Sequence, residues 1–270
     1  MKKFGILLAS LILCCWTAQS QNFTYPTAPR LSAPTYQNLS KSIEESPTSK
    51  NVASTLPRFG EMVKSYGILA TIRGVRSYSE KDDYIPISDM KYLTISQYTN
   101  ICKSTCGKYE KLSKYITPLL KHRICSFYNN IGYIEDVTVV KAKMCPDFAV
   151  NSANDTCVYV GSFSLDVTFN TLRTSETERA KTAIERVILP IIQKTIDDLV
   201  NIGHQYIMIG VGYGIRDFSE SYGDEGACVM CIFSISDLKD FADLELSQEE
   251  LLHKSSVYLR DTGEIKKVSL

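Results

Sequence analysis

The sequence has few of the residues and motifs on which catalysis usually depends. Among its 270 residues are one tryptophan and three histidines, His122, His204 and His253. It contains neither the Gly-x-Ser-x-Gly pattern of serine hydrolases nor the His-Glu-x-x-His pattern of metalloproteases, and no phosphate-binding or calcium-binding loop. The carboxylates show no spacing that marks an acid–base pair. We therefore expect no catalytic motif, no metal site and no cofactor.

The three histidines are interpreted as structural residues. His122 lies between Lys121 and Arg123 on an expected surface, and His253 lies in a polar turn. His204 follows an expected helix, where a protonated imidazole would suit the negative end of the helix dipole.

The formal net charge of the chain is zero, because 30 basic residues balance 30 acidic ones. A balanced charge gives no general attraction to nucleic acid or to an anionic membrane. No segment beyond the N-terminus is apolar enough to suggest a membrane span. The hydrophobic fraction of 44% suits a protein with a sizeable core.

The N-terminus resembles a signal peptide in its pattern. Two lysines at positions 2–3 precede the apolar stretch 4–16, and small residues lead to Ser20, after which we expect cleavage. A bacterial lipidation site at Cys14 or Cys15 is the alternative. Either reading predicts export, to the extracellular space or, in a bacterium, to the periplasm or cell surface.

Cysteine usage gives the second argument for export. Two of the nine cysteines lie in the expected signal peptide. The other seven are Cys102, Cys106, Cys125, Cys145, Cys157, Cys228 and Cys231. An oxidising compartment favours disulfides, and a Cys145–Cys157 bond would close a polar loop at a gain of roughly 2–3 kcal/mol. The odd number leaves one thiol free or available for a disulfide-linked dimer.

Two cysteine pairs have spacings that could indicate other chemistry. Cys102 and Cys106 are four residues apart on an expected helix, but no further ligands follow at zinc-finger spacing. Cys228 and Cys231 have the spacing of redox motifs, but they fall in an expected strand. Residues three apart in a strand point to opposite faces and cannot bond to each other. We therefore expect neither a zinc site nor a redox pair.

Three Asn-x-Ser/Thr sequences, at Asn22, Asn38 and Asn154, are candidate glycosylation sites if the protein is eukaryotic. The first two fall in a stretch rich in Pro, Ser and Thr, residues 21–57, which we interpret as a flexible leader. The remaining residues, 58–270, are expected to form a single domain.

The clearest pattern begins at Ser175, which forms a capping box with Glu178. Apolar residues then recur at helical spacing up to Gly203, a residue suited to ending the helix. Pro190 lies inside this pattern and predicts a kink or break.

A strand follows, over residues 207–215, with large apolar side chains on one face. The other face carries Gly210, Gly212 and Gly214, which leave room for something to come close. A packed helix or another backbone is the favoured occupant, and a ligand is the alternative. The glycines do not match a dinucleotide-binding fingerprint, because no third spaced glycine and no helix follow.

Weaker patterns predict the other elements. Strands are expected over 66–78, 132–144, 157–169 and 226–236, the third with one solvent-facing side. Helices are expected over 96–121, with interruptions at Gly107 and Pro118, and over 247–253. A hairpin turning at Asp261 ends the chain. The predicted fold is α+β: an antiparallel sheet of about five strands with two main helices packed on one face, stabilised by disulfides.

Residues 201–215 followed by 229–233 resemble the end of the CAP (cysteine-rich secretory, pathogenesis-related) domain, in which a helix leads into an Ile-Gly-Val-Gly-Tyr strand. The His and Glu of that family's cavity have no counterpart here, so the resemblance implies no site residues. The sequence favours a secreted, disulfide-stabilised protein that binds an extracellular protein or glycan or serves as a matrix component. A secreted enzyme or CAP-like module, with a site assembled from distant residues, is the alternative.

Overall fold

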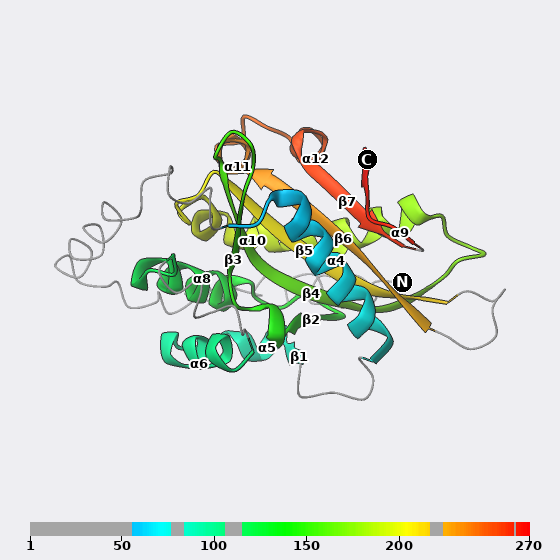
Figure 1. The fold of residues 1–270 in the computed structure, drawn as a ribbon, viewed down its shortest axis with the longest axis horizontal. Helices are drawn as coiled ribbons and strands as arrows, with labels where there is room; N and C mark the ends of the chain where they lie inside the picture. The colour runs from blue at the N-terminus through cyan, green and yellow to red at the C-terminus, as the bar shows by residue number, and fades with distance from the viewer. Residues whose placement is uncertain (1–55, 77–83, 106–114, 217–223, 262) are drawn as a thin grey trace, which may run out of the picture. The chain divides into compact units, whose positions relative to one another are not determined.

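A long mixed β-sheet runs through the structure, a computed structural model that describes residues 56–76, 84–105, 115–216, 224–261 and 263–270 (Figure 1). Its strands lie in the order β1-β2-β4-β5-β6-β7-β8, and β3 also pairs with β4. Their bounds are β1 Tyr84–Pro86, β2 Val137–Val140, β3 Asp147–Val150, β4 Thr156–Asn170, β5 Tyr206–Arg216, β6 Asp224–Ser234, β7 Ser256–Arg260 and β8 Lys266–Val268. All neighbours are antiparallel except β4 and β5, which are parallel.

Helices cover both faces of this sheet. Their bounds are α4 Phe59–Arg76, α5 Ile87–Met90, α6 Ile95–Thr105, α8 Pro118–Asn130, α9 Glu176–Ala183, α10 Leu189–Val200, α11 Ile235–Ala242 and α12 Gln248–Lys254. Buried residues of α6, α8, α9 and α10 join one face of the sheet in the main core cluster. Helix α4 lies against β5 and β6 on the other face, where a smaller cluster forms (Figure 1).

The prediction of an α+β fold is therefore confirmed in its coarse form only. The sheet is larger than expected, with eight strands, and it contains one parallel pair. Strand β4 does not have the expected solvent-facing side along its first half, because residues 157–163 are buried on both faces. Exposed residues return only at Asp166 and Thr168, near the end of the strand.

The parallel pair is joined by the predicted 175–203 helix, which forms a β4–helix–β5 crossover. Its capping box is confirmed: the Glu178 backbone N–H donates to Ser175 Oγ at 3.2 Å, and the Ser175 N–H donates to the Glu178 carboxylate at 2.7 Å. Gly203 has φ +88°, the predicted left-handed conformation, and lies two residues after Asn201, the C-cap of α10.

The kink or break expected near Pro190 takes the form of a π-helical segment over Ile184–Ile188, which connects α9 directly to α10. Proline lacks a backbone N–H, and its ring crowds the carbonyl four residues earlier. A wider π turn before Pro190 relieves both conflicts without ending the helix.

The strand predicted over 66–78 is wrong, because residues 66–76 belong to α4, and residues 77–78 lie outside the described part of the chain. Met62, Val63 and Tyr66 are buried at helical spacing against the sheet. Tyr66 stacks on Tyr159 with ring centroids 3.9 Å apart, and its hydroxyl donates to the Asp147 carboxylate at 2.7 Å. These contacts with distant residues outweigh the local pattern that suggested a strand.

Within the helix predicted over 96–121, the described residues contribute to α6 and to α8, whereas residues 106–114, with the interruption expected at Gly107, lie outside the described part of the chain. Thr117 caps the second helix by accepting the Leu120 N–H at 3.1 Å, and Pro118 occupies its first turn, where a missing N–H does no harm. The strand predicted over 132–144 is shorter in the structure, where it spans Val137–Val140. The capping box of α12 and the final hairpin, β7 with β8, are confirmed.

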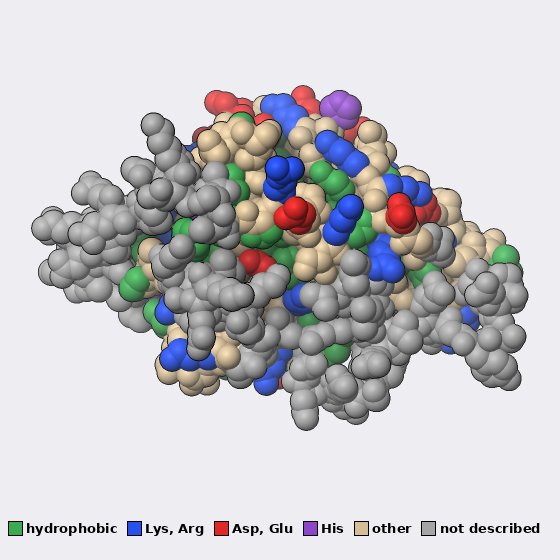
Figure 2. Space-filling model, in the orientation of Figure 1, with side chains coloured by type: hydrophobic (Ala, Val, Ile, Leu, Met, Phe, Trp, Pro, Cys, Tyr) green, Lys and Arg blue, Asp and Glu red, His purple; other side chains and the backbone are tan. Residues whose placement is uncertain are grey.

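The described part of the chain contains no helix that is long and apolar enough to cross a bilayer. The face drawn in Figure 2 shows Lys and Arg side chains interspersed with acidic and neutral ones. Residues 1–55 lie outside the described residues, so the signal peptide, the leader and the domain boundaries stay predictions.

Candidate functional site

No disulfide joins the six cysteines that the structure describes, which contradicts the predicted disulfide framework. The register of the β3–β4 hairpin explains the error for Cys145 and Cys157. Cys157 pairs with Ala149, and Cys145 precedes Ala149 by four residues, which is roughly 13 Å of extended chain. A disulfide needs Cα atoms less than about 7 Å apart. Cys106 lies outside the described residues, so a disulfide-linked dimer through this thiol stays a prediction.

Four of these thiols, those of Cys125, Cys157, Cys228 and Cys231, are also poor nucleophiles. Cys228 belongs to the core cluster under α4 and Cys231 to the main cluster, so the two point to opposite faces as expected. Burial raises the pKa of the Cys228 thiol to about 12 and that of Cys125 to about 11. Burial also raises the pKa values of Cys157 and Cys231. A thiol must ionise to attack or to bind a metal, and these remain protonated.

Native-state alkylation should therefore leave the six described cysteines unmodified. We expect iodoacetamide at pH 8 to label them only after unfolding in guanidinium, with no reductant needed, because each is buried and none is oxidised. Peptide mapping by mass spectrometry reads every site separately. Labelling only after reduction would restore the disulfide interpretation.

The three histidines do not come together. His122 lies in α8, His253 in α12 and His204 in the loop before β5. Burial lowers the pKa of His204 to about 4, so at neutral pH its imidazole does not carry the positive charge that would suit the helix dipole. Among the described residues, no three His, Cys, Asp or Glu side chains are grouped to hold a metal ion.

The glycine face of β5 is filled by neighbouring side chains. A Cβ at Gly210 would lie 3.1 Å from the hydroxyl of Tyr159, and one at Gly214 would lie 2.7 Å from Oγ1 of Thr168. Both neighbours belong to β4. At these two positions the glycines make room for side chains of the adjacent strand. Helix α4 lies over this same face, which also carries Met208, so the favoured prediction of a packed helix is confirmed.

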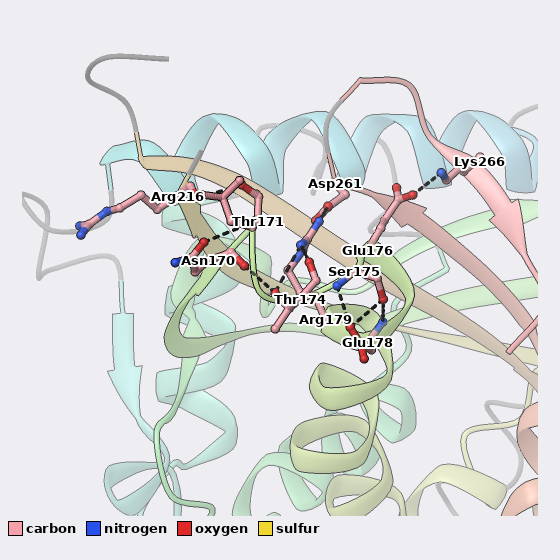
Figure 3. Close-up of polar contacts among 11 residues, drawn as sticks. Asn170, Thr171, Thr174, Ser175, Glu176, Glu178, Arg179, Arg216, Asp261 and Lys266 are labelled. Carbon is pink, nitrogen blue, oxygen red and sulfur yellow. Dashed lines mark hydrogen bonds and ion pairs between the residues drawn. The ribbon is translucent and has the colours of Figure 1, made fainter. Parts of the chain in front are cut away.

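The polar cluster that sequence reasoning missed lies at the carboxyl ends of β4 and β5 (Figure 3). At its centre is a buried ion pair between Arg179 of α9 and Asp261, in the turn after β7, each 4% exposed. The Arg179 Nε donates to Asp261 Oδ1 at 3.2 Å, and its Nη2 donates to Oδ2. The pair joins segments 82 residues apart, so no local pattern could reveal it.

The same arginine holds the loop that leads into α9. Its Nη1 donates to the carbonyl of Thr174 (Figure 3). At the other end of the loop, the Thr171 N–H and hydroxyl both donate to the Arg216 carbonyl of β5, at 3.2 Å. Residues 170–174, which we name the edge loop, are thus fastened to α9 on one side and to β5 on the other.

Hydrogen bonds inside the edge loop fix its shape. The Leu172 N–H donates to the Asn170 side chain, and the Thr174 hydroxyl donates to the Asn170 carbonyl, both at 2.9 Å. The Leu172 residue is nevertheless 75% exposed. A large apolar side chain is therefore presented to solvent on an ordered loop, with the exposed Arg173 beside it.

Ion pairing and capping complete this edge. Lys266 of β8 pairs with Glu176 in the first turn of α9. The Ser175 backbone and side chain lower the pKa of Glu178, whose carboxylate accepts from both. With its N-cap donors already satisfied, the start of α9 is not arranged as an anion-binding site.

Of the candidate glycosylation sites, only Asn154 is described, and it lies exposed in the turn of the β3–β4 hairpin with φ +65°. Asn22 and Asn38 lie outside the described residues, and glycosylation stays a prediction.

Comparison of this chain with protein-family models, with curated proteins and with solved structures found no match. The CAP resemblance thus gains no support from these comparisons, although β5 and β6 do pair antiparallel along their full lengths.

Proposed function

We propose that this chain acts by binding a protein partner, through the edge loop at the carboxyl ends of β4 and β5. The observation that carries the proposal is an exposed leucine on a loop whose backbone is fixed at both ends. Binding and catalytic residues often lie on loops that a rigid scaffold positions. The carboxyl ends of parallel strands are also where open α/β sheets usually bind their ligands.

Preorganisation makes this loop suited to recognition. Ordering a loop when a complex forms opposes binding, and a loop already held in place avoids much of that loss. Leu172 would insert as an apolar anchor, and Arg173 would contribute to the polar rim around it.

Binding is favoured over catalysis because the described groups with catalytic potential are held in unsuitable states. The thiols described above have raised pKa values, and His204 has one lowered to about 4. A general base or nucleophile at neutral pH needs a pKa near 7 or an activating partner. Turnover of any member of a broad hydrolase substrate panel would contradict this part of the proposal.

Capture of a partner tests the proposed surface. Immobilised wild-type chain, Leu172→Asp and Leu244→Asp are incubated with extract and medium of cells that make the protein. Leu244 is a matched control, because it is 91% exposed in the loop after α11. We expect the wild type and Leu244→Asp to retain the same partner protein in similar amounts. Leu172→Asp should retain at least tenfold less of it. Equal retention by all three, or none by the wild type, would contradict the proposal.

A further inference from the structure

His204 lies where the α10–β5 loop meets the β3–β4 hairpin. Its Nδ1 is 3.1 Å from Thr156 Oγ1 at the start of β4. Its ring lies on Phe148 of β3, with centroids 5.2 Å apart. One side chain therefore contacts both strands of the hairpin from a loop on the other side of the crossover.

A chain of hydrogen bonds fixes the tautomer of this imidazole. The side-chain oxygen of Gln205 accepts from the Thr156 N–H at 2.8 Å and from the Thr156 hydroxyl at 2.5 Å. Because that hydroxyl donates to Gln205, its oxygen is left to accept a proton from His204 Nδ1. The neutral ring thus carries its hydrogen on Nδ1, and Nε2 is the atom that takes up a further proton.

None of the described carboxylates near His204 would stabilise a positive charge there. Nε2 makes no hydrogen bond with any described residue, and burial is the sole cause of the lowered pKa. On the hairpin, the Asp155 carboxylate accepts from Asn151, and that of Asp147 accepts from Tyr66 on the opposite face of the sheet. The thiol of Cys157, next to Thr156, is buried and stays protonated.

The helices beside His204 offer no stabilising charge either. From α8, the Arg123 guanidinium reaches within 3.7 Å of a Cβ built at Gly203, so a cation already lies beside this loop. The Asp198 carboxylate of α10 is bound by Asn130.

The hairpin also holds the entry into α4. The Val150 N–H donates to the Pro57 carbonyl at 2.9 Å, and Arg58 pairs with Val150 as an isolated parallel bridge. Movement of β3 would therefore release residues 57–58 from the sheet.

We propose that His204 is an acid-sensitive latch, whose protonation at Nε2 detaches the β3–β4 hairpin from the α10–β5 loop and frees the attachment of Pro57 and Arg58.

The direction of the effect follows from the two protonation states. In the closed hairpin the pKa of His204 is about 4, whereas an opened, solvated imidazole has a pKa near 6.5. Below pH 6.5 the open form binds a proton that the closed form rejects, so opening becomes more favourable as the pH falls towards 4. The latch is fully effective above pH 6.5. Between pH 7.5 and 4.5 the opening constant should rise roughly 50- to 100-fold.

Hydrogen exchange measured at pH 7.5 and 4.5, and corrected for the intrinsic pH dependence of exchange, tests this latch. We expect the corrected opening constant of amides in β3 and at the start of β4 to rise by the stated factor in the wild type. His204→Asn keeps a donor near the Nδ1 position but cannot titrate, and should remove the rise. His253→Asn, an exposed histidine of α12, should leave it unchanged.

Three results would overturn the latch: no local rise in the wild type, the same rise in His204→Asn, or a rise shared equally by β6 and α12. If His204→Asn does not fold, a nuclear magnetic resonance titration of the wild-type imidazole decides. A His204 pKa below 5 supports the latch, and a value of 6 or above contradicts it.

Discussion

Replacing Arg179 by alanine is expected to lower the free energy of unfolding by about 3–5 kcal/mol. The substitution leaves the carboxylate of Asp261, 4% exposed, buried without its partner. It also removes the donor that holds the Thr174 carbonyl of the edge loop. Urea unfolding followed by circular dichroism measures the loss.

Two control variants separate the buried charge from a general effect on α9. Arg179→Met combined with Asp261→Leu removes both charges, so it should recover most of the lost stability. Lys181→Ala removes an exposed ion pair with Glu185, 3.7 Å apart, and should change stability by less than about 0.5 kcal/mol. Equal losses for Arg179→Ala and Lys181→Ala would show that the Arg179–Asp261 pair is not formed.

Replacing Gly161 by alanine is expected to destabilise the fold by about 3 kcal/mol or more. The new Cβ would lie 2.4 Å from the Tyr128 hydroxyl and 3.3 Å from the ring carbon that bears it. Tyr128 is fully buried, and its hydroxyl donates to the Val160 carbonyl at 2.9 Å, so it has little freedom to move. Thermal unfolding and urea unfolding both report the change.

Gly212 provides the matched control for this substitution. A Cβ there would meet nothing closer than the Ala227 carbonyl oxygen at 3.8 Å, so Gly212→Ala should be neutral or slightly stabilising. Adding Tyr128→Phe to Gly161→Ala removes the clashing oxygen and should restore part of the stability. If Gly161→Ala were as stable as Gly212→Ala, the packing of α8 against β4 would differ from that described.

The elements predicted correctly are those whose signals are local. Ser175 and Glu178 mark the start of the crossover helix by themselves, and Gly203 marks its end. The alternation after residue 206 likewise identifies β5 and its two faces. Helix α4 could not be found in this way, because its position depends on Tyr66 contacting Tyr159 and Asp147, about 80 residues or more further along the chain.

The candidate site was not predictable for the same reason. Arg179 looks like any charged residue near a helix start, and Asp261 like any turn residue; only the fold brings them together. The disulfide prediction failed differently, because it was inferred from the expected compartment and not from geometry. Because no disulfide joins the six described cysteines, the prediction of export depends on residues 1–20 alone and stays a prediction.

Site-specific photo-cross-linking tests the central claim, that the edge loop is a binding surface, most directly. A photoreactive amino acid is placed at position 172 or, as the matched exposed control, at position 244, in cells that naturally make the chain. We expect a discrete protein adduct from position 172 and none from position 244. Equal adducts at both positions, or none at position 172, would contradict the claim.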